Sequence, residues 1–162
     1  GARIFDRLES WKFAELADRI YEKYNIKILF TWAPGQKELV DQIIQKIKTA
    51  SYALLSSNLQ ELGAITLRAQ FVVCHNGGYM HMVSVLGTPV VALFGWANPA
   101  IWKPLSDKSA VVYKNLECSP CGSKTIKSEC LAGDPECKRL ITVDDIISAI
   151  KKVYFPPIIA NE

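Results

Sequence analysis

Short, almost wholly apolar segments recur along this chain, and segments with helical periodicity separate them. The expected strands comprise residues 26–30, 52–55, 71–74, 89–94 and 110–113. A strand that is apolar on both sides must be covered on both faces, and β-α-β crossovers place helices there. The sequence therefore predicts an α/β fold built on a Rossmann-like, doubly wound parallel sheet.

The segments between these strands each carry one apolar face at helical spacing. The expected helices comprise residues 16–24, 39–47, 58–68, 79–86 and 143–154. Ser57 or Asn58 can cap the third helix, and Thr142 can cap the last, because their side-chain oxygens accept from free N–H groups of a first turn. Gly87 is placed to end the fourth helix before the next strand begins.

Composition limits the classes of partner. The chain has 162 residues, is 49% hydrophobic and carries a formal charge of +3. That charge is far from the concentrated basic surfaces of nucleic-acid-binding proteins, so no nucleic-acid partner is expected. The longest apolar stretch, residues 83–95, is interrupted and shorter than the roughly 20 residues that cross a bilayer. Because the chain starts at Gly1 with no signal-like segment, we expect a domain cut from a longer protein.

The sharpest motif follows the third expected strand, where Asn76, Gly77 and Gly78 lead into a helix that carries His81. In open α/β sheets, ligands bind beyond the carboxyl ends of the strands, and free N–H groups at a helix start attract phosphate. Glycine lets the backbone approach an anion closely. The alternatives are a plain connecting turn and a surface histidine. His75, at the strand end, is interpreted as structural.

Two further loops follow expected strands and reach the same edge of the sheet. One contains Gly95 and Trp96, and the other contains Pro34 and Gly35. The indole ring can stack on a base or a sugar, or it can pack beneath the loop. Several small-residue loops at one edge favour a binding site over a set of simple connections.

Four of the five cysteines form the pattern C-x2-C-x8-C-x6-C, made by Cys118, Cys121, Cys130 and Cys137. Four thiolates can enclose a structural zinc ion, two disulfides are a second possibility, and reduced thiols are a third. Cys74 lies on an expected buried strand and is interpreted as a core residue. The pattern alone leaves the three states of the cysteine segment, residues 118–137, open.

Residues 76–82, with the sequence NGGYMHM, and residues 86–95, with the sequence LGTPVVALFG, resemble the signature of glycosyltransferase family 9. That family contains the lipopolysaccharide heptosyltransferases. The similarity continues in Asn98-Pro99, Trp102 and Pro104, and in the cysteine segment. It is looser upstream, where it includes Trp11, Pro34-Gly35 and Glu38.

The resemblance implies that residues 1–162 form a single C-terminal nucleotide-sugar-binding domain of a two-domain GT-B enzyme. The enzyme would transfer sugar from an ADP-heptose-like donor to lipopolysaccharide core or a related surface glycan, with inversion and with no cofactor required for catalysis. The catalytic base would belong to an N-terminal domain that this chain does not contain. No catalytic residue is therefore expected here, and the isolated domain is expected to be inactive.

The resemblance also assigns roles to residues. Gly77 and Gly78 would hold the donor diphosphate, and the further donor-binding residues would be Asn76, Met80, His81, Gly95, Trp96, Pro34, Gly35 and Glu38. Asn76 stands where the family usually has Asp, and Gly77 stands where it usually has Ser or Thr. Glu9 occupies the place of a phosphate-binding lysine, for which Lys12 is a candidate substitute.

The expected partners are a nucleotide-sugar donor and, through the N-terminal domain, a glycolipid acceptor. The expected location is the cytoplasm, with the full-length enzyme able to associate peripherally with the inner membrane. Two alternatives remain at this stage. One is a non-catalytic nucleotide-sugar-binding module of the same fold, and the other is a zinc-stabilised interaction module.

Overall fold

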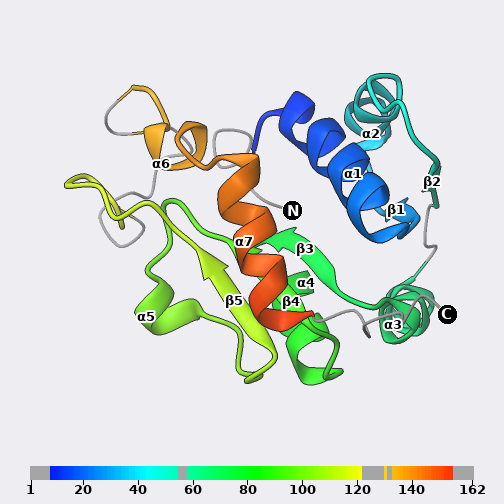
Figure 1. The fold of residues 1–162 in the computed structure, drawn as a ribbon. Coiled ribbons are helices and arrows are strands. Elements are labelled where there is room, and N and C mark those ends of the chain that lie inside the picture. The colour runs from blue at the N-terminus through cyan, green and yellow to red at the C-terminus, as the bar shows by residue number, and fades with distance from the viewer. Residues whose placement is uncertain (1–7, 55–57, 122–129, 131–132, 155–162) are drawn as a thin grey trace, which may run out of the picture.

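The computed structural model describes residues 8–54, 58–121, 130 and 133–154, and Figure 1 shows their arrangement. The helices are α1 (Ser10–Tyr24), α2 (Lys37–Ile44), α3 (Leu59–Arg68), α4 (Gly78–Val85), α5 (Pro99–Trp102), α6 (Glu136–Arg139) and α7 (Val143–Val153). The strands are β1 (Ile28–Phe30), β2 (Ser51–Ala53), β3 (Val72–His75), β4 (Val90–Leu93) and β5 (Ser109–Val112). Every strand expected from the sequence is present, so the α/β class is confirmed.

All strand pairs are parallel, but the ladders form two sheets rather than the single expected one. β1 pairs with β2, and β3, β4 and β5 form a three-stranded sheet with β4 in the centre. Ile28 of β1 packs against the same core cluster as Phe71 and Val73. The two sheets are therefore joined by a shared apolar core.

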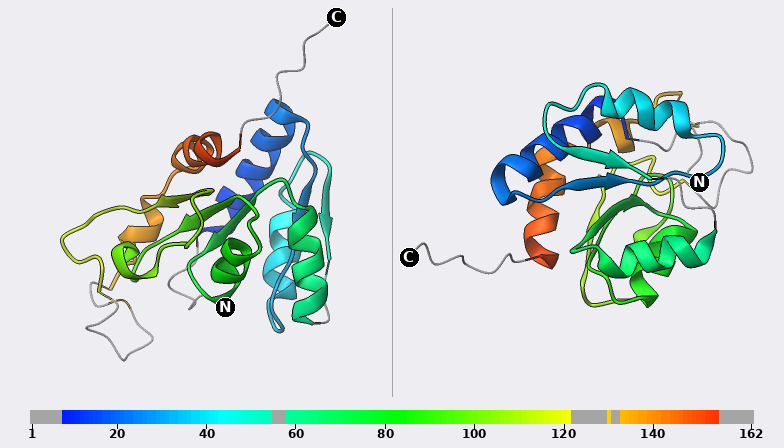
Figure 2. Two further views of the ribbon diagram at one scale, coloured as in Figure 1. Left: turned by 90° about the horizontal axis from the view of Figure 1, so that it is seen from below. Right: turned by 90° about the vertical axis from the view of Figure 1, so that its right-hand side faces the viewer.

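The central strand β4 is buried on both faces. Val91 and Leu93 contribute to a core cluster with residues of α1 and α7, whereas Val90 and Ala92 contribute to a second cluster with residues of α4. All four side chains are 0% exposed. The views in Figure 2 show helices on both sides of the strands. This arrangement confirms the doubly wound interpretation.

The helices differ from the expected ones in their bounds, most clearly in α1 and α2, and in two short helices that were not expected. α1 begins at Ser10, about one and a half turns before its periodic apolar face becomes clear. α2 ends at Ile44, because the N–H groups of Lys46 and Ile47 donate to carbonyls three residues earlier and tighten the last turn. The short helices α5 and α6 were not expected, since four residues are too few to show a period.

The predicted caps at Asn58 and Thr142 are confirmed. Asn58 Oδ1 accepts a hydrogen bond from the N–H of Glu61 at 2.9 Å. Thr142 Oγ1 accepts from the N–H of Asp145 at 3.1 Å, and the Asp145 carboxylate accepts from the N–H of Thr142 at 2.8 Å. The second pair is a capping box, which fixes the start of α7. Helices of the length and apolar character that a membrane crossing requires do not occur among the described residues.

Cys74 of β3 packs against the core cluster of α4, as its interpretation as a core residue implied. Burial raises the pKa of its thiol to about 12, and the nearby charge of Lys138 opposes that rise in part. The thiol therefore stays protonated, and unreactive, at neutral pH. Cys118, by contrast, is exposed.

Replacing Thr142 with alanine removes the side-chain half of the capping box. We expect the free energy of unfolding to fall by about 1 kcal/mol, since an N-cap hydroxyl satisfies one otherwise free N–H group. Urea unfolding followed by circular dichroism measures the change. The control is Ser148→Ala, at an exposed position inside α7. Equal stabilities of the two variants would contradict the proposed contribution of the cap.

Iodoacetamide at about pH 8 should alkylate Cys118 quickly and leave Cys74 unmodified in the folded chain, because alkylation requires an accessible thiolate. Peptide mass mapping reads each position separately. In denaturant both cysteines should react, which controls for the intrinsic reactivity of each peptide. Rapid alkylation of Cys74 in the native chain would show that the core cluster of α4 does not protect its thiol.

Candidate functional site

The candidate site is the glycine turn, defined as Asn76, Gly77 and Gly78, which joins β3 to α4. Gly77 has φ 152°, a conformation that favours glycine. A Cβ atom built on Gly77 or Gly78 would meet no other heavy atom within 4 Å. Both residues are exposed. The first N–H groups of α4 therefore start at an open surface, where an anion can reach them.

Asn76 anchors one end of this turn. Its N–H donates to the carbonyl of Leu93, the last residue of β4, at 3.1 Å. Its side-chain Oδ1 is buried, and no hydrogen-bond partner for it is found among the described residues. A buried acceptor without a donor is costly, so a ligand hydroxyl placed beside it would gain a favourable bond.

His81 lies four residues beyond Gly77, and its N–H donates to the Gly77 carbonyl at 3.3 Å. The imidazole is half-buried. Its ring centroid is 6.5 Å from that of Trp102 in an edge-on arrangement. Trp102 belongs to α5, so the contact brings the segment after β4 beside the first turns of α4. The structure thus joins His81 to a second loop at this edge of the sheet.

Three of the expected donor-binding residues make contacts within the protein in this structure. Met80 is 0% exposed and packs in the core cluster of α4, so the structure does not bring it to the open side of the turn. Trp96 packs against the same cluster, the alternative to stacking on a ligand. Gly95 is buried, and its carbonyl accepts a hydrogen bond from the Ser119 hydroxyl.

The other expected residues follow β1, with Pro34 and Gly35 in the loop and Glu38 in the first turn of α2. Pro34, Gly35 and Glu38 are all exposed, and Gly35 has φ 78°, a turn conformation that suits glycine. The side chains of Pro34 and Glu38 are therefore accessible, and their contact with a donor stays a prediction.

Tyr79 connects this loop to the site, a role that sequence analysis missed. Its hydroxyl lies 3.0 Å from Thr66 Oγ1 on α3. Burial raises the pKa of Tyr79, while hydrogen bonds with Thr66 and Thr31 lower it in part. Thr31 directly follows β1, so the tyrosine holds the end of β1 and helix α3 against α4. A single tyrosine in a helix gave no signal for this contact.

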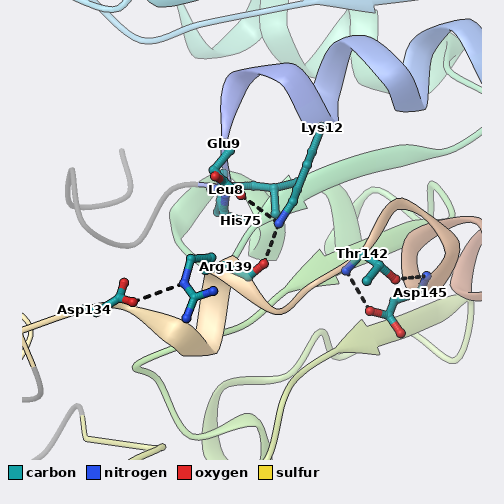
Figure 3. A network of polar contacts seen from close by, with 8 residues as sticks. All are labelled: Leu8, Glu9, Lys12, His75, Asp134, Arg139, Thr142 and Asp145. Carbon is teal, nitrogen blue, oxygen red and sulfur yellow. Dashed lines mark hydrogen bonds and ion pairs between the residues drawn. The ribbon is translucent and has the colours of Figure 1, made fainter.

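His75 and Lys12 hold the segment before α1 against this end of the sheet, as Figure 3 shows. His75 Nε2 accepts a hydrogen bond from the N–H of Leu8 at 2.9 Å, which agrees with a structural role. The Lys12 ammonium contacts Glu9 Oε2 at 2.8 Å and the Arg139 carbonyl at 2.5 Å. A hydrogen bond from Lys12 is the main reason why the pKa of Glu9 is lowered. Lys12 is thus engaged within the protein, and the structure does not present it as a phosphate ligand.

The four cysteines of the cysteine segment differ in exposure: Cys118 is exposed, Cys121 and Cys130 are half-buried, and Cys137 is buried. Across residues 8–54, 58–121, 130 and 133–154, no group of three or more histidine, cysteine or acidic side chains is placed to hold a metal ion. The thiols would have to move together before they could ligate zinc. Zinc binding stays a prediction, which elemental analysis of the purified protein can test.

The chain is similar in sequence and in fold to several heptosyltransferases. The lipopolysaccharide core heptosyltransferase OpsX of Haemophilus influenzae is 30% identical over 105 residues, which cover 62% of this chain and 29% of that protein. The structure of the E. coli ADP-heptose heptosyltransferase II is similar with a TM-score of 0.76 at 19% identity, covering 94% of this chain and 44% of that one. E. coli heptosyltransferase WaaC, solved with ADP, has a TM-score of 0.71 at 16% identity, covering 94% and 42%.

These similarities show that the fold is the Rossmann-like fold of the heptosyltransferases, and that the chain spans less than half of each of those proteins. The model of glycosyltransferase family 9 (heptosyltransferase) matches residues 7–132. This match includes α1, the glycine turn and most of the cysteine segment. Because it covers most of the sequence, the chain belongs to glycosyltransferase family 9.

Proposed function

We propose that this chain is the donor-binding C-terminal domain of an inverting glycosyltransferase, and that its donor is ADP-heptose or a close analogue. The observation that carries the proposal is the open glycine turn at the start of α4, with nothing within 4 Å of either built Cβ. Membership of family 9 supports the reaction class. The named relatives include an ADP-heptose heptosyltransferase and a heptosyltransferase solved with ADP, which supports the choice of donor.

In this proposal the diphosphate lies against the backbone N–H groups at Gly77 and Gly78. An α-helix carries a partial positive charge at its N-terminus, and these N–H groups have no partner within the helix. As the bond from sugar to diphosphate breaks, negative charge accumulates on the leaving oxygen. The fixed N–H donors stabilise that charge without having to reorient, so the domain contributes electrostatic catalysis and requires no metal.

His81 and Asn76 would complete the donor pocket. The imidazole can donate to a phosphate oxygen or a sugar hydroxyl, and the free Oδ1 of Asn76 can accept from a sugar hydroxyl. The acceptor hydroxyl of lipopolysaccharide core or a related glycan would attack the anomeric carbon from the opposite side, with inversion. The base that removes its proton would come from the N-terminal domain. The assembled enzyme would work in the cytoplasm, beside the membrane that carries its glycolipid acceptor.

Calorimetric titration tests the donor assignment. ADP-heptose and ADP should bind the chain more tightly than UDP or GDP. His81→Ala should weaken ADP-heptose binding by roughly tenfold, the usual effect of losing one hydrogen bond to a charged group. Ser148→Ala, on the far helix α7, is the matched control and should bind like the original chain. A preference for UDP or GDP would refute an ADP-linked donor, and a folded chain that binds none of them would refute the donor-binding role.

The division of labour between domains predicts that the 162-residue chain transfers no sugar by itself. Incubation with ADP-heptose and a lipopolysaccharide core acceptor, followed by mass spectrometry of the acceptor, should show no product. A full-length family 9 enzyme assayed in parallel controls for the substrates. Product formed by the isolated chain would refute the assignment of the base to another domain.

Asn76→Asp, in an enzyme that contains both domains, distinguishes an active transferase from a non-catalytic module of the same fold. If the asparagine suits the natural donor, the substitution should leave transfer unchanged or reduce it, because a further negative charge is placed near the diphosphate. Activity that appears only after this substitution would instead indicate a binding module that has lost transfer.

A further inference from the structure

Lys138 of α6 is one of the most completely buried residues described, with 1% of its surface exposed. Its ammonium donates to the carbonyl of Leu93, the last residue of β4, at 2.9 Å. Removing an ammonium from water is costly, and an apolar side chain of similar length would fill the same space at lower cost. Packing alone therefore does not explain why a lysine occupies this position.

The buried ammonium and the glycine turn contact the same backbone carbonyl. The Leu93 carbonyl that accepts from Lys138 also accepts from the N–H of Asn76 at 3.1 Å. One oxygen atom therefore links the charge to the first residue of the turn. The charge of Lys138 also opposes part of the rise in the pKa of Cys74, which lies on the strand that leads into this turn.

Neighbouring contacts hold Lys138 in place. The Arg139 carbonyl accepts from the Lys12 ammonium, which ties α6 to α1 (Figure 3). The Arg139 guanidinium extends to the surface, where it contacts Asp134 at 3.1 Å and Glu136 at 2.7 Å. The Arg139 guanidinium thus contacts surface carboxylates, while the contacts of the adjacent Lys138 include the carboxyl end of β4.

We propose that the buried charge of Lys138 determines how tightly the glycine turn binds a diphosphate. The proposal rests on the donor-binding function proposed above and adds a residue that does not itself touch the ligand. Salt and water screen a buried charge only weakly, so its field adds to the partial positive charge at the start of α4. A diphosphate carries at least two negative charges and gains from this field, whereas a nucleoside without phosphate does not.

The test compares ADP with adenosine on the original chain, Lys138→Met and Lys138→Gln. Methionine has nearly the length of lysine but no charge, and glutamine keeps an N–H donor for the Leu93 carbonyl without a charge. Both variants should bind ADP roughly tenfold more weakly and adenosine as tightly as before. Lys152→Met, which removes the same charge from an exposed position on α7, should change neither affinity.

Three results would overturn the proposal, and they differ from one another. Recovery of ADP affinity in the glutamine variant would show that the hydrogen bond matters and the charge does not. Equal losses for ADP and adenosine would show a general structural role. An original chain that binds neither ligand would overturn the donor-binding function as well. Circular dichroism establishes that each variant is folded, and the glutamine variant decides the question if the methionine variant does not fold.

Discussion

Burial of β4 on both faces is the constraint on which the rest of the structure depends. Because alternate side chains of a strand point in opposite directions, this one strand requires α1 and α7 on one side and α4 on the other. The parallel direction of β3 and β5 follows from the helical crossovers. The carboxyl ends of all three strands therefore lie at one edge, and the glycine turn is part of that edge. The candidate site is a consequence of how the core is covered.

The parts of the fold that could be predicted from the sequence are those that depend on residues close together in the chain. The caps at Asn58 and Thr142 depend on residues three positions apart, and the apolar strands are continuous in the sequence. The division into two sheets was not predictable, because it depends on how closely β1 approaches β3 across the shared core. Helices of four residues, such as α5 and α6, lack the length in which a period can be recognised.

The candidate site was predicted only in part, for a related reason. The glycines and His81 could be proposed as site residues because a turn after a strand has a defined place in this fold. Packing decided the positions of Met80, which is buried in the core cluster of α4, and of Trp96, which packs against that cluster. Lys138 could not have been found, since a lysine in a polar segment is normally solvated, and only the folded structure shows its burial. A buried side chain that contacts the backbone next to a turn leaves no pattern in the sequence.

The two ends of the segment between Ser119 and Lys138 are fixed to neighbouring points of the same strand end. The Ser119 hydroxyl donates to the Gly95 carbonyl, and the Lys138 ammonium donates to the Leu93 carbonyl. Lengthening a chain segment whose ends are already held together costs little free energy. Insertions or deletions between these two anchors can therefore accumulate during evolution without displacing the site. We expect the length of this segment to vary among related enzymes more freely than that of the glycine turn.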